Sequence, residues 1–140
     1  MKNLILTLGL LLIAALGCTA PRSSGSSSSS KAATSAPTII YGKPSFESLG
    51  RAGSIVHIQV TNTSDKTLQF VEGHMALYDK SGDLVSSQNG YCETQTLTPG
   101  GKGVVKIMVD KDSRVSRYEM TFSAQVDGEF GDTQLTAVQK

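Results

Sequence analysis

The residues of this chain whose side chains could carry chemistry are two histidines, two cysteines and one acidic turn. His57 and His74 are of the type that binds transition metals or moves protons near neutral pH. Cys18 and Cys92 bear thiols, which serve as metal ligands, nucleophiles or attachment points. The segment 79–83 (Asp-Lys-Ser-Gly-Asp) offers oxygen ligands of the kind that calcium prefers. Whether any of these residues forms a site depends on the elements that position them.

Alternation of apolar and polar residues runs through most of the chain after residue 37. Clear examples are Val56–Val60, Val105–Val109 and Tyr118–Ala124. This period of two is typical of half-buried antiparallel strands, and turn-forming residues separate the segments. No stretch of ten or more residues in this part has the apolar spacing of an amphipathic helix. The predicted strands cover residues 38–48, 54–62, 67–79, 83–95, 102–110, 115–126 and 133–138.

These seven strands predict an all-β fold for residues 38–140, an immunoglobulin-like antiparallel β-sandwich, with a barrel as the less favoured alternative. The domain is nearly neutral. Of the 13 Lys and Arg residues, three precede Pro37, which leaves ten against 12 Asp and Glu. A balance of this kind argues against nucleic-acid binding, which requires a clustered basic face. It also gives no support for a polybasic patch that would bind lipid.

The predicted sandwich separates the candidate metal ligands. Its second and third strands belong to opposite sheets, and the parity of His57 and His74 turns both rings outward, onto opposite faces. We therefore expect no joint metal site and no cofactor. The segment 79–83 lacks the ligand spacing and the final Glu of a calcium loop, so we interpret it as a hairpin turn. No Gly-x-Ser-x-Gly elbow is present, and we expect no catalytic residue and no enzymatic activity.

The amino-terminal residues resemble a bacterial lipoprotein signal. Lys2 precedes an apolar run over 4–16, which is shorter than the ~20 residues that a membrane-spanning helix requires. The following Gly17-Cys18 completes a segment similar to the lipobox, in which Cys becomes the first mature residue and carries the lipid. An ordinary signal peptide cut after Ala20 is the alternative. The resemblance implies a signal peptide over 1–17 and a membrane anchor at Cys18.

A Ser-rich tether follows the lipidated cysteine. Residues 18–37 include five consecutive serines and have little to bury, so we expect them to form a flexible coil. A coil of this length typically reaches ~25 Å. In enterobacterial lipoproteins Asp after the lipidated Cys retains the protein in the inner membrane, and here Thr19 stands in that place. The resemblance therefore implies the outer membrane of a Gram-negative cell, on a face that the sequence leaves open.

Four segments of the domain resemble the FxLYD family. Residues 74–82 (His-Met-Ala-Leu-Tyr-Asp-Lys-Ser-Gly) are similar to its signature, with Met75 in place of Phe. Residues 62–67 resemble its Asn-rich turn, and residues 97–102 resemble its Leu-x-Pro-Gly step. Ser116–Glu119 resembles its late strand with a Tyr. The resemblance covers roughly 54–124 and implies an immunoglobulin-like sandwich on exported proteins, with no catalytic residue in the motif.

The motif residues have a predicted structural role. Met75 and Leu77 point into the sandwich, with Tyr78 between them and the turn. Asp79 opens a hairpin that Gly82 closes, because a left-handed backbone costs Gly little. Tyr118 suits a tyrosine corner, in which its hydroxyl bonds to an upstream main-chain group.

Cys92 has no intrachain partner if Cys18 is lipidated. The favoured interpretation is a small residue buried beneath a strand, because free Cys is among the most buried residue types. The alternative is an exposed free thiol that pairs with another subunit or a partner.

The sequence thus favours a non-enzymatic, membrane-anchored lipoprotein whose β-sandwich is an interaction or structural module. Its expected partners are the membrane, through Cys18, and an unidentified envelope protein that docks on a sheet edge or face. A small-ligand-binding or hydrolytic envelope protein is the alternative. It would require a pocket of a few hundred Å³ lined by at least two titratable groups. A domain that mainly spaces or decorates the surface is a third possibility.

Overall fold

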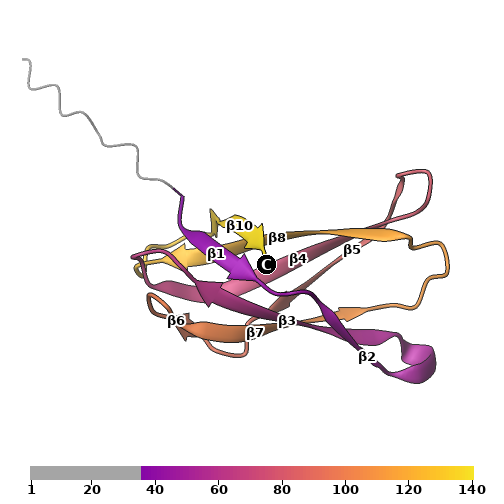
Figure 1. The fold of residues 1–140 in the computed structure, drawn as a ribbon, viewed down its shortest axis with the longest axis horizontal. Helices are drawn as coiled ribbons and strands as arrows, with labels where there is room; N and C mark the ends of the chain where they lie inside the picture. Colours follow the sequence, from indigo (N-terminus) through magenta and orange to yellow (C-terminus); the bar gives the residue numbers. More distant parts are fainter. Residues whose placement is uncertain (1–35) are drawn as a thin grey trace, which may run out of the picture. The chain divides into compact units, whose positions relative to one another are not determined.

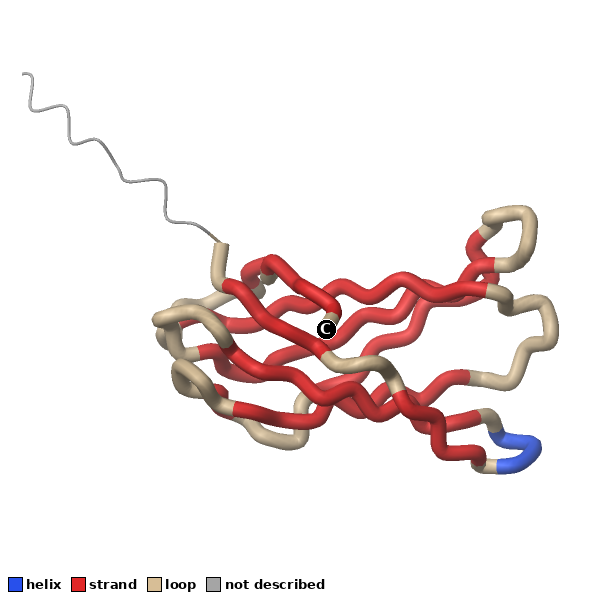
Figure 2. The backbone as a smooth tube through the Cα atoms, viewed as in Figure 1, coloured by secondary structure: helices blue, strands red, loops and turns tan. Residues whose placement is uncertain are grey.

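The computed structural model describes residues 36–140. The predicted signal peptide, the predicted lipidation site Cys18 and all but the last two residues of the predicted tether lie outside the described residues. The described chain consists of β-strands and a single short 3-10 helix over Gly50–Ala52 (Figures 1 and 2). The strands are β1 (Thr38–Tyr41), β2 (Ser45–Ser48), β3 (Ser54–Asn62), β4 (Leu68–Tyr78), β5 (Leu84–Tyr91), β6 (Thr96–Leu97), β7 (Lys102–Val109), β8 (Arg117–Val126), β9 (Thr133–Gln134) and β10 (Thr136–Gln139).

The strands form two facing sheets (Figure 1). Sheet A is built on the antiparallel pair β3–β7 and also contains β1, β2 and β10. Sheet B is built on the antiparallel pair β4–β8 and also contains β5, β6 and β9. The second and third predicted strands, now β3 and β4, lie in opposite sheets as expected. The predicted β-sandwich is confirmed, and every predicted strand region contains at least one strand.

The core lies between the two sheets, where the alternating apolar residues meet. Val56, Ile58 and Val60 of β3 are buried, while the polar residues between them face outward. Sheet B contributes the same pattern from β4 and β8. The side chains with almost no exposed surface are Phe122, Ile39, Ile58, Leu68, Met75, Leu97, Ile107, Val56, Val60, Val71, Val105 and Asn62. Apolar burial of this kind is the main source of stability in a domain of this size.

The first predicted strand is divided into two. β1 and β2 both pair with β3 on the same side, but the chain between them, around Gly42–Pro44, leaves the ladder. Pro44 has no N–H to donate, so a continuous strand through this point would lack a ladder bond. The strand therefore bends, and Gly42 keeps one bond by donating its N–H to the Gln59 carbonyl at 2.8 Å.

The last predicted strand also forms two elements, one in each sheet. β9 pairs with β8 in sheet B, and β10 pairs in parallel with β1 in sheet A. Leu135, between them, is buried and donates its N–H to the Phe122 carbonyl. The carboxyl-terminal segment therefore connects the two sheets, with the side chain of Leu135 in the core.

Candidate functional site

The signature segment 74–82 has the structural role predicted for it. Met75 and Leu77 are buried in the core. The Asp79 Oδ1 atom accepts hydrogen bonds from the N–H groups of Ser81 and Asp83, at 2.8 and 3.0 Å. Gly82 has a φ of 92°, in the region that favours glycine. Asp79 and Gly82 therefore shape the turn between β4 and β5.

Tyr118 does not form the predicted tyrosine corner. Its ring packs against the core, and within residues 36–140 its hydroxyl makes no hydrogen bond. The tyrosine of the signature, Tyr78, makes more polar contacts. Its hydroxyl donates to Glu119 at 3.1 Å, and the Arg117 guanidinium lies 4.1 Å from the centre of its ring. On the outer face of sheet B, Tyr78 of β4 therefore packs against two charged side chains of β8.

Asn62 has a structural role that the sequence did not reveal. Its side chain is fully buried, and its amide donates to the carbonyls of Lys66 and Leu97 at 2.7 and 2.9 Å. Its Oδ1 atom accepts from the N–H and the hydroxyl of Ser64. The main chain of Asn62 also pairs with residues 100 and 101. Asn62 therefore joins two of the four segments that resemble the FxLYD family, 62–67 and 97–102.

The two histidines lie on opposite outer faces, as predicted. His57 of β3 is 2.9 Å from the Glu47 carboxylate of the neighbouring β2. His74 of β4 is on sheet B, on the other side of the sandwich. Among the described residues, no group of three His, Cys, Asp or Glu side chains is placed to hold a metal ion.

A polar cluster surrounds His74 on the outer face of sheet B. His74 Nε2 lies 3.5 Å from the Glu72 carboxylate and 3.4 Å from the Ser123 hydroxyl. The Glu72 side chain is only 13% exposed, and it accepts a hydrogen bond from the Asn89 amide. The negative charge of Glu72 also raises the pKa of the neighbouring Tyr91. The cluster brings a serine, a histidine and a carboxylate together from two strands.

This arrangement does not have the geometry of a nucleophilic triad. A triad uses one ring nitrogen of His to take the proton of the serine and the other to donate to a carboxylate, which orients the ring and stabilises its charged form. Here the same Nε2 atom of His74 faces both Glu72 and Ser123. Ser123 is also buried and cannot reach a substrate carbonyl. The cluster is therefore a polar network that links β4, β5 and β8.

Cys92 is buried, as the favoured interpretation expected. Its N–H donates to the Val71 carbonyl, and it forms an isolated bridge with Val105 of β7. A Cβ atom at Gly103 would lie 2.3 Å from the Cys92 sulfur, so glycine at 103 makes room for the thiol. Burial raises the pKa of the Cys92 thiol, which disfavours the reactive thiolate.

The glycine within β4 also has a structural explanation. A Cβ atom at Gly73 would lie 2.9 Å from Val105 Cγ1 and 3.3 Å from Phe122 Cε1. Gly73 therefore permits close packing of the two sheets, and its presence in β4 says nothing about a binding surface.

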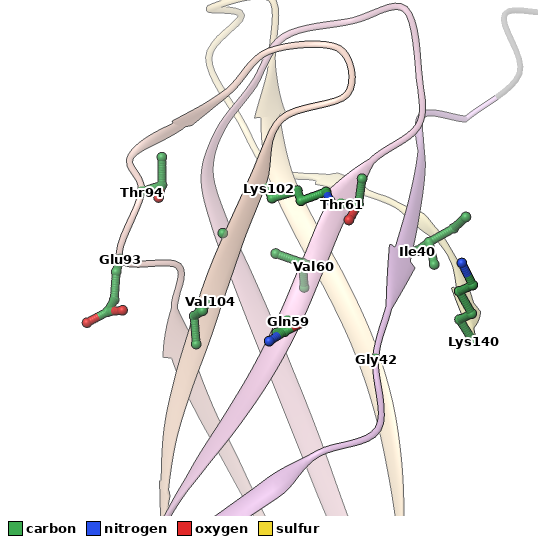
Figure 3. Close-up of a pocket in the computed structure, with 11 residues that line it drawn as sticks. Ile40, Gly42, Gln59, Val60, Thr61, Glu93, Thr94, Lys102, Val104 and Lys140 are labelled. Atoms are coloured by element: carbon green, nitrogen blue, oxygen red, sulfur yellow. The ribbon is translucent and has the colours of Figure 1, made fainter.

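A half-open groove of about 590 Å³ lies on the outer face of sheet A (Figure 3). Its floor consists of outward side chains from three adjacent strands. The lining residues are Ile40, Gly42, Gln59, Val60, Thr61, Glu93, Thr94, Lys102, Gly103, Val104 and Lys140. In register, Ile40, Thr61 and Lys102 form one row across the sheet, and Gln59 and Val104 begin the next row.

The groove contains both signs of charge. In Figure 3, Glu93 lies at the left of the groove, Lys102 near its middle and Lys140 at the right. Glu93 is held in place by an ion pair with Lys106 at 2.7 Å. The remaining polar side chains are neutral, so the groove offers hydrogen bonds and two cationic groups over a partly apolar floor. A small-ligand site was expected to require a pocket of a few hundred Å³ lined by at least two titratable groups. The groove, with about 590 Å³ and with Glu93, Lys102 and Lys140, meets both requirements.

A second hollow, of about 710 Å³, lies at the end of the sandwich where the described chain begins. Its charged side chains are Asp65, Lys66 and Glu129. Lys66 already forms an ion pair with Asp127 at 3.0 Å. Because Lys66, the cationic side chain of this hollow, is already paired with Asp127, the hollow is a weaker candidate for ligand binding than the groove on sheet A.

Comparison with known proteins identifies a similar fold. IrmA from Escherichia coli has a similar structure. The alignment has a TM-score of 0.57 and 11% sequence identity, and it covers 74% of this chain and 92% of that one. At this identity the likeness shows the fold alone. No family model and no curated protein matches the chain, so the FxLYD resemblance stays a prediction. Within residues 36–140, no helix is long and apolar enough to cross a membrane.

Proposed function

We propose that this protein is a non-enzymatic lipoprotein of the bacterial envelope that uses its β-sandwich to bind another envelope protein. The observation that carries the proposal is the half-open groove on the outer face of sheet A. Its floor is a strip of side chains from β1, β3 and β7. A strip of this kind can accept an extended or flat partner surface with alternating apolar and polar contacts.

The polar groups of the domain support binding over catalysis. The one serine–histidine–carboxylate cluster uses a single ring nitrogen for both contacts, and its serine is buried. The charged residues of the groove are Lys102, Lys140 and Glu93, and Glu93 is paired with Lys106. Lysines and threonines on an open strip suit recognition of a partner with acidic and hydrogen-bonding groups.

The anchor is the part of the proposal that comes from the sequence. Acylation of Cys18 would attach the protein to the membrane, and more than one acyl chain gives stable attachment. The test is fractionation of cells that produce wild-type protein or the Cys18→Ser variant. We expect the variant in the soluble periplasmic fraction. A Cys18→Ser protein that stays with membranes would show that another anchor exists.

The partner can be identified by crosslinking from inside the groove. A photoreactive amino acid at Gln59, in the groove, should give one dominant adduct in living cells. The matched control is the same amino acid at Thr121, which is exposed on the outer face of sheet B. Adducts that are equal from both positions, or that contain only abundant envelope proteins, would contradict docking at the groove and favour a spacer.

The groove also favours a second candidate, a small-ligand-binding or hydrolytic envelope protein. Its volume of about 590 Å³ is within the usual range for small-molecule sites. A screen of anionic and polar small molecules by thermal shift, with Lys102→Ala as the comparison, tests this function. A ligand that stabilises the wild type but not Lys102→Ala would support a ligand site at the groove.

A further inference from the structure

Two lysine side chains at the groove on sheet A have no acidic partner within residues 36–140. Lys102 and Lys140 line the groove, and neither makes an ion pair in this part of the chain. The one carboxylate side chain among the lining residues, that of Glu93, is already paired with Lys106 at 2.7 Å. The groove therefore offers two cationic groups, and an occupant with two negative groups complements them.

The strand register places Lys102 and Lys140 on either side of the floor that β3 and β1 form. One row of outward side chains crosses β7, β3, β1 and β10 and consists of Lys102, Thr61, Ile40 and Val138. Lys140 lies two residues beyond Val138, in the next row. Three strand spacings of ~4.8 Å and one step of two residues, ~6.8 Å, separate the two lysines. Their Cα atoms are therefore ~16 Å apart on the diagonal.

The floor between the two lysines is apolar and partly bare. Ile40 is half-buried, and Val138, its register partner on β10, is 50% exposed beside it. Gly42 has no side chain, and a Cβ atom there would meet nothing nearer than Gln59, at 3.8 Å. This part of the groove therefore has room for one apolar side chain of an occupant, between the two cationic groups.

We propose that the groove binds an extended segment of the partner protein with the pattern acidic–x–apolar–x–acidic. This inference rests on the proposed function and names what the groove recognises. In an extended segment the first, third and fifth side chains point to the same side, and the first and fifth are ~13.6 Å apart. One carboxylate then lies at Lys102, the other lies at Lys140, and the apolar side chain covers Ile40 and Gly42. The flexible lysine side chains close the remaining distance.

A helical segment with the same sequence would not complement the groove. Side chains four residues apart on a helix have Cβ atoms ~5–6 Å apart, which is less than half of the distance between Lys102 and Lys140. The apolar residue, two positions from each acid, would lie ~200° around the helix and point away from the floor. A helix would therefore engage one lysine at a time and leave Ile40 uncovered, so the groove favours an extended segment.

The first test compares two peptides of equal composition on the wild-type, full-length protein in a nonionic detergent at low ionic strength. Ser-Glu-Thr-Val-Thr-Glu-Ser has the proposed spacing, and Ser-Glu-Glu-Val-Thr-Thr-Ser has adjacent acids. Both peptides have blocked ends and carry a fluorescent label without net charge. We expect anisotropy titrations to show at least about threefold tighter binding of the spaced peptide, because it engages one more lysine. Equal affinities of the two peptides would overturn the proposal.

The second test reverses the charge of each lysine. Lys102→Glu and Lys140→Glu should each abolish the preference for the spaced peptide, and Lys102→Gln should reduce it. The matched control is Lys80→Glu, in the turn between β4 and β5, which should leave the preference unchanged. Circular dichroism checks that each variant is folded. A preference that persists in folded Lys102→Glu and Lys140→Glu proteins would contradict recognition by these lysines.

The peptides and the crosslinks from Gln59 test different statements. A dominant adduct from Gln59 together with equal binding of the two peptides would leave docking at the groove intact and overturn the acidic pattern. A preference for the spaced peptide without a dominant adduct would support the pattern and contradict docking in cells.

Discussion

Replacement of Asn62 by alanine should strongly destabilise the sandwich. The change removes the amide that binds the carbonyls of Lys66 and Leu97, and the oxygen that accepts from Ser64. Each hydrogen bond contributes about 1 kcal/mol net, and a buried group left without a partner costs about 1–3 kcal/mol. Water can replace the bonds to the partly exposed turn, but the bond to Leu97 is buried. We therefore expect a loss of about 2–4 kcal/mol.

The assay is urea unfolding of the Cys18→Ser protein, in which circular dichroism monitors the loss of secondary structure. Asn62→Ala should lower the unfolding midpoint with little change in the slope, because the surface exposed on unfolding is nearly the same. Ser64→Ala is the matched control. It removes only the hydroxyl bonds of the same turn and should cost about 1 kcal/mol. A loss below about 0.5 kcal/mol for Asn62→Ala would refute the reasoning, since it would mean that water satisfies the Leu97 carbonyl.

Asn62→Asp gives a further check, because it keeps the shape of the side chain and replaces the amide donor with a carboxylate oxygen. The introduced carboxylate would face two carbonyl oxygens in a buried place, so its pKa should be raised in the folded state. A carboxyl with a raised pKa destabilises the folded state once it ionises. The variant should therefore be closest to wild-type stability below about pH 4 and lose stability as the pH rises from there.

Three further predictions concern packing, pH and the thiol. A Cβ atom at Gly90 would lie 1.8 Å from a main-chain oxygen of β7, so Gly90→Ala should lower the free energy of unfolding by about 3 kcal/mol or more. In the same urea assay Gly42→Ala should be nearly neutral, because the nearest atoms to a Cβ there are 3.8 Å away. The main-chain N–H of Thr67, just before β4, and the side chain of Lys66 lower the pKa of Asp127. The stability that Asp127 contributes is therefore present above about pH 4 and disappears as the pH falls through its folded-state pKa. Asp127→Asn should therefore show a smaller stability loss than the wild type between about pH 4 and pH 2, measured by thermal unfolding. Cys92 should react with a maleimide only after unfolding, and non-reducing gels should show no dimer that Cys92→Ser abolishes; rapid labelling of the native protein would contradict its burial.

The strands could be predicted from the sequence because alternation is a local property. The runs around Val56–Val60 and Val105–Val109 face the core as their parity indicates. The inward positions of Met75 and Leu77 follow from the same rule. A pattern of this kind needs no knowledge of the neighbouring strand, since it depends only on which side of the sheet is buried.

The contacts between distant strands could not be predicted, because they depend on register. The approach of His74 to Ser123 requires the pairing of β4 with β8, and a shift of one residue would move every side chain to the other face. The parallel pairing of β10 with β1 likewise has no local signal. Tyr118 gives an error of another kind. Its position near the start of β8 was predicted correctly, but its hydroxyl does not make the hydrogen bond that was expected.

Asn62 could have been recognised in part. An amide side chain at the end of a strand, followed by Ser64, is typical of a turn that closes on its own main chain. Its bond to Leu97 spans 35 residues of sequence and appears only when β6 pairs with β4. The contacts of Asn62 within its own turn could therefore be predicted from the sequence, whereas its bond to Leu97 could not.

Two glycines and Cys92 together determine how long the free edge of β5 can be. Gly90 lets the main chain of β7 approach β5, and Gly103 makes room for the sulfur of Cys92. From Cys92 onward the strand therefore turns its outward N–H groups to β7, as the bond from Glu93 to Val104 shows. The same packing that buries the thiol leaves residues 84–89 as the part of β5 with free main-chain groups. A substitution at Gly90 that separates β5 from β7 should then expose Cys92, so the Gly90→Ala protein should react with a maleimide faster than the wild type.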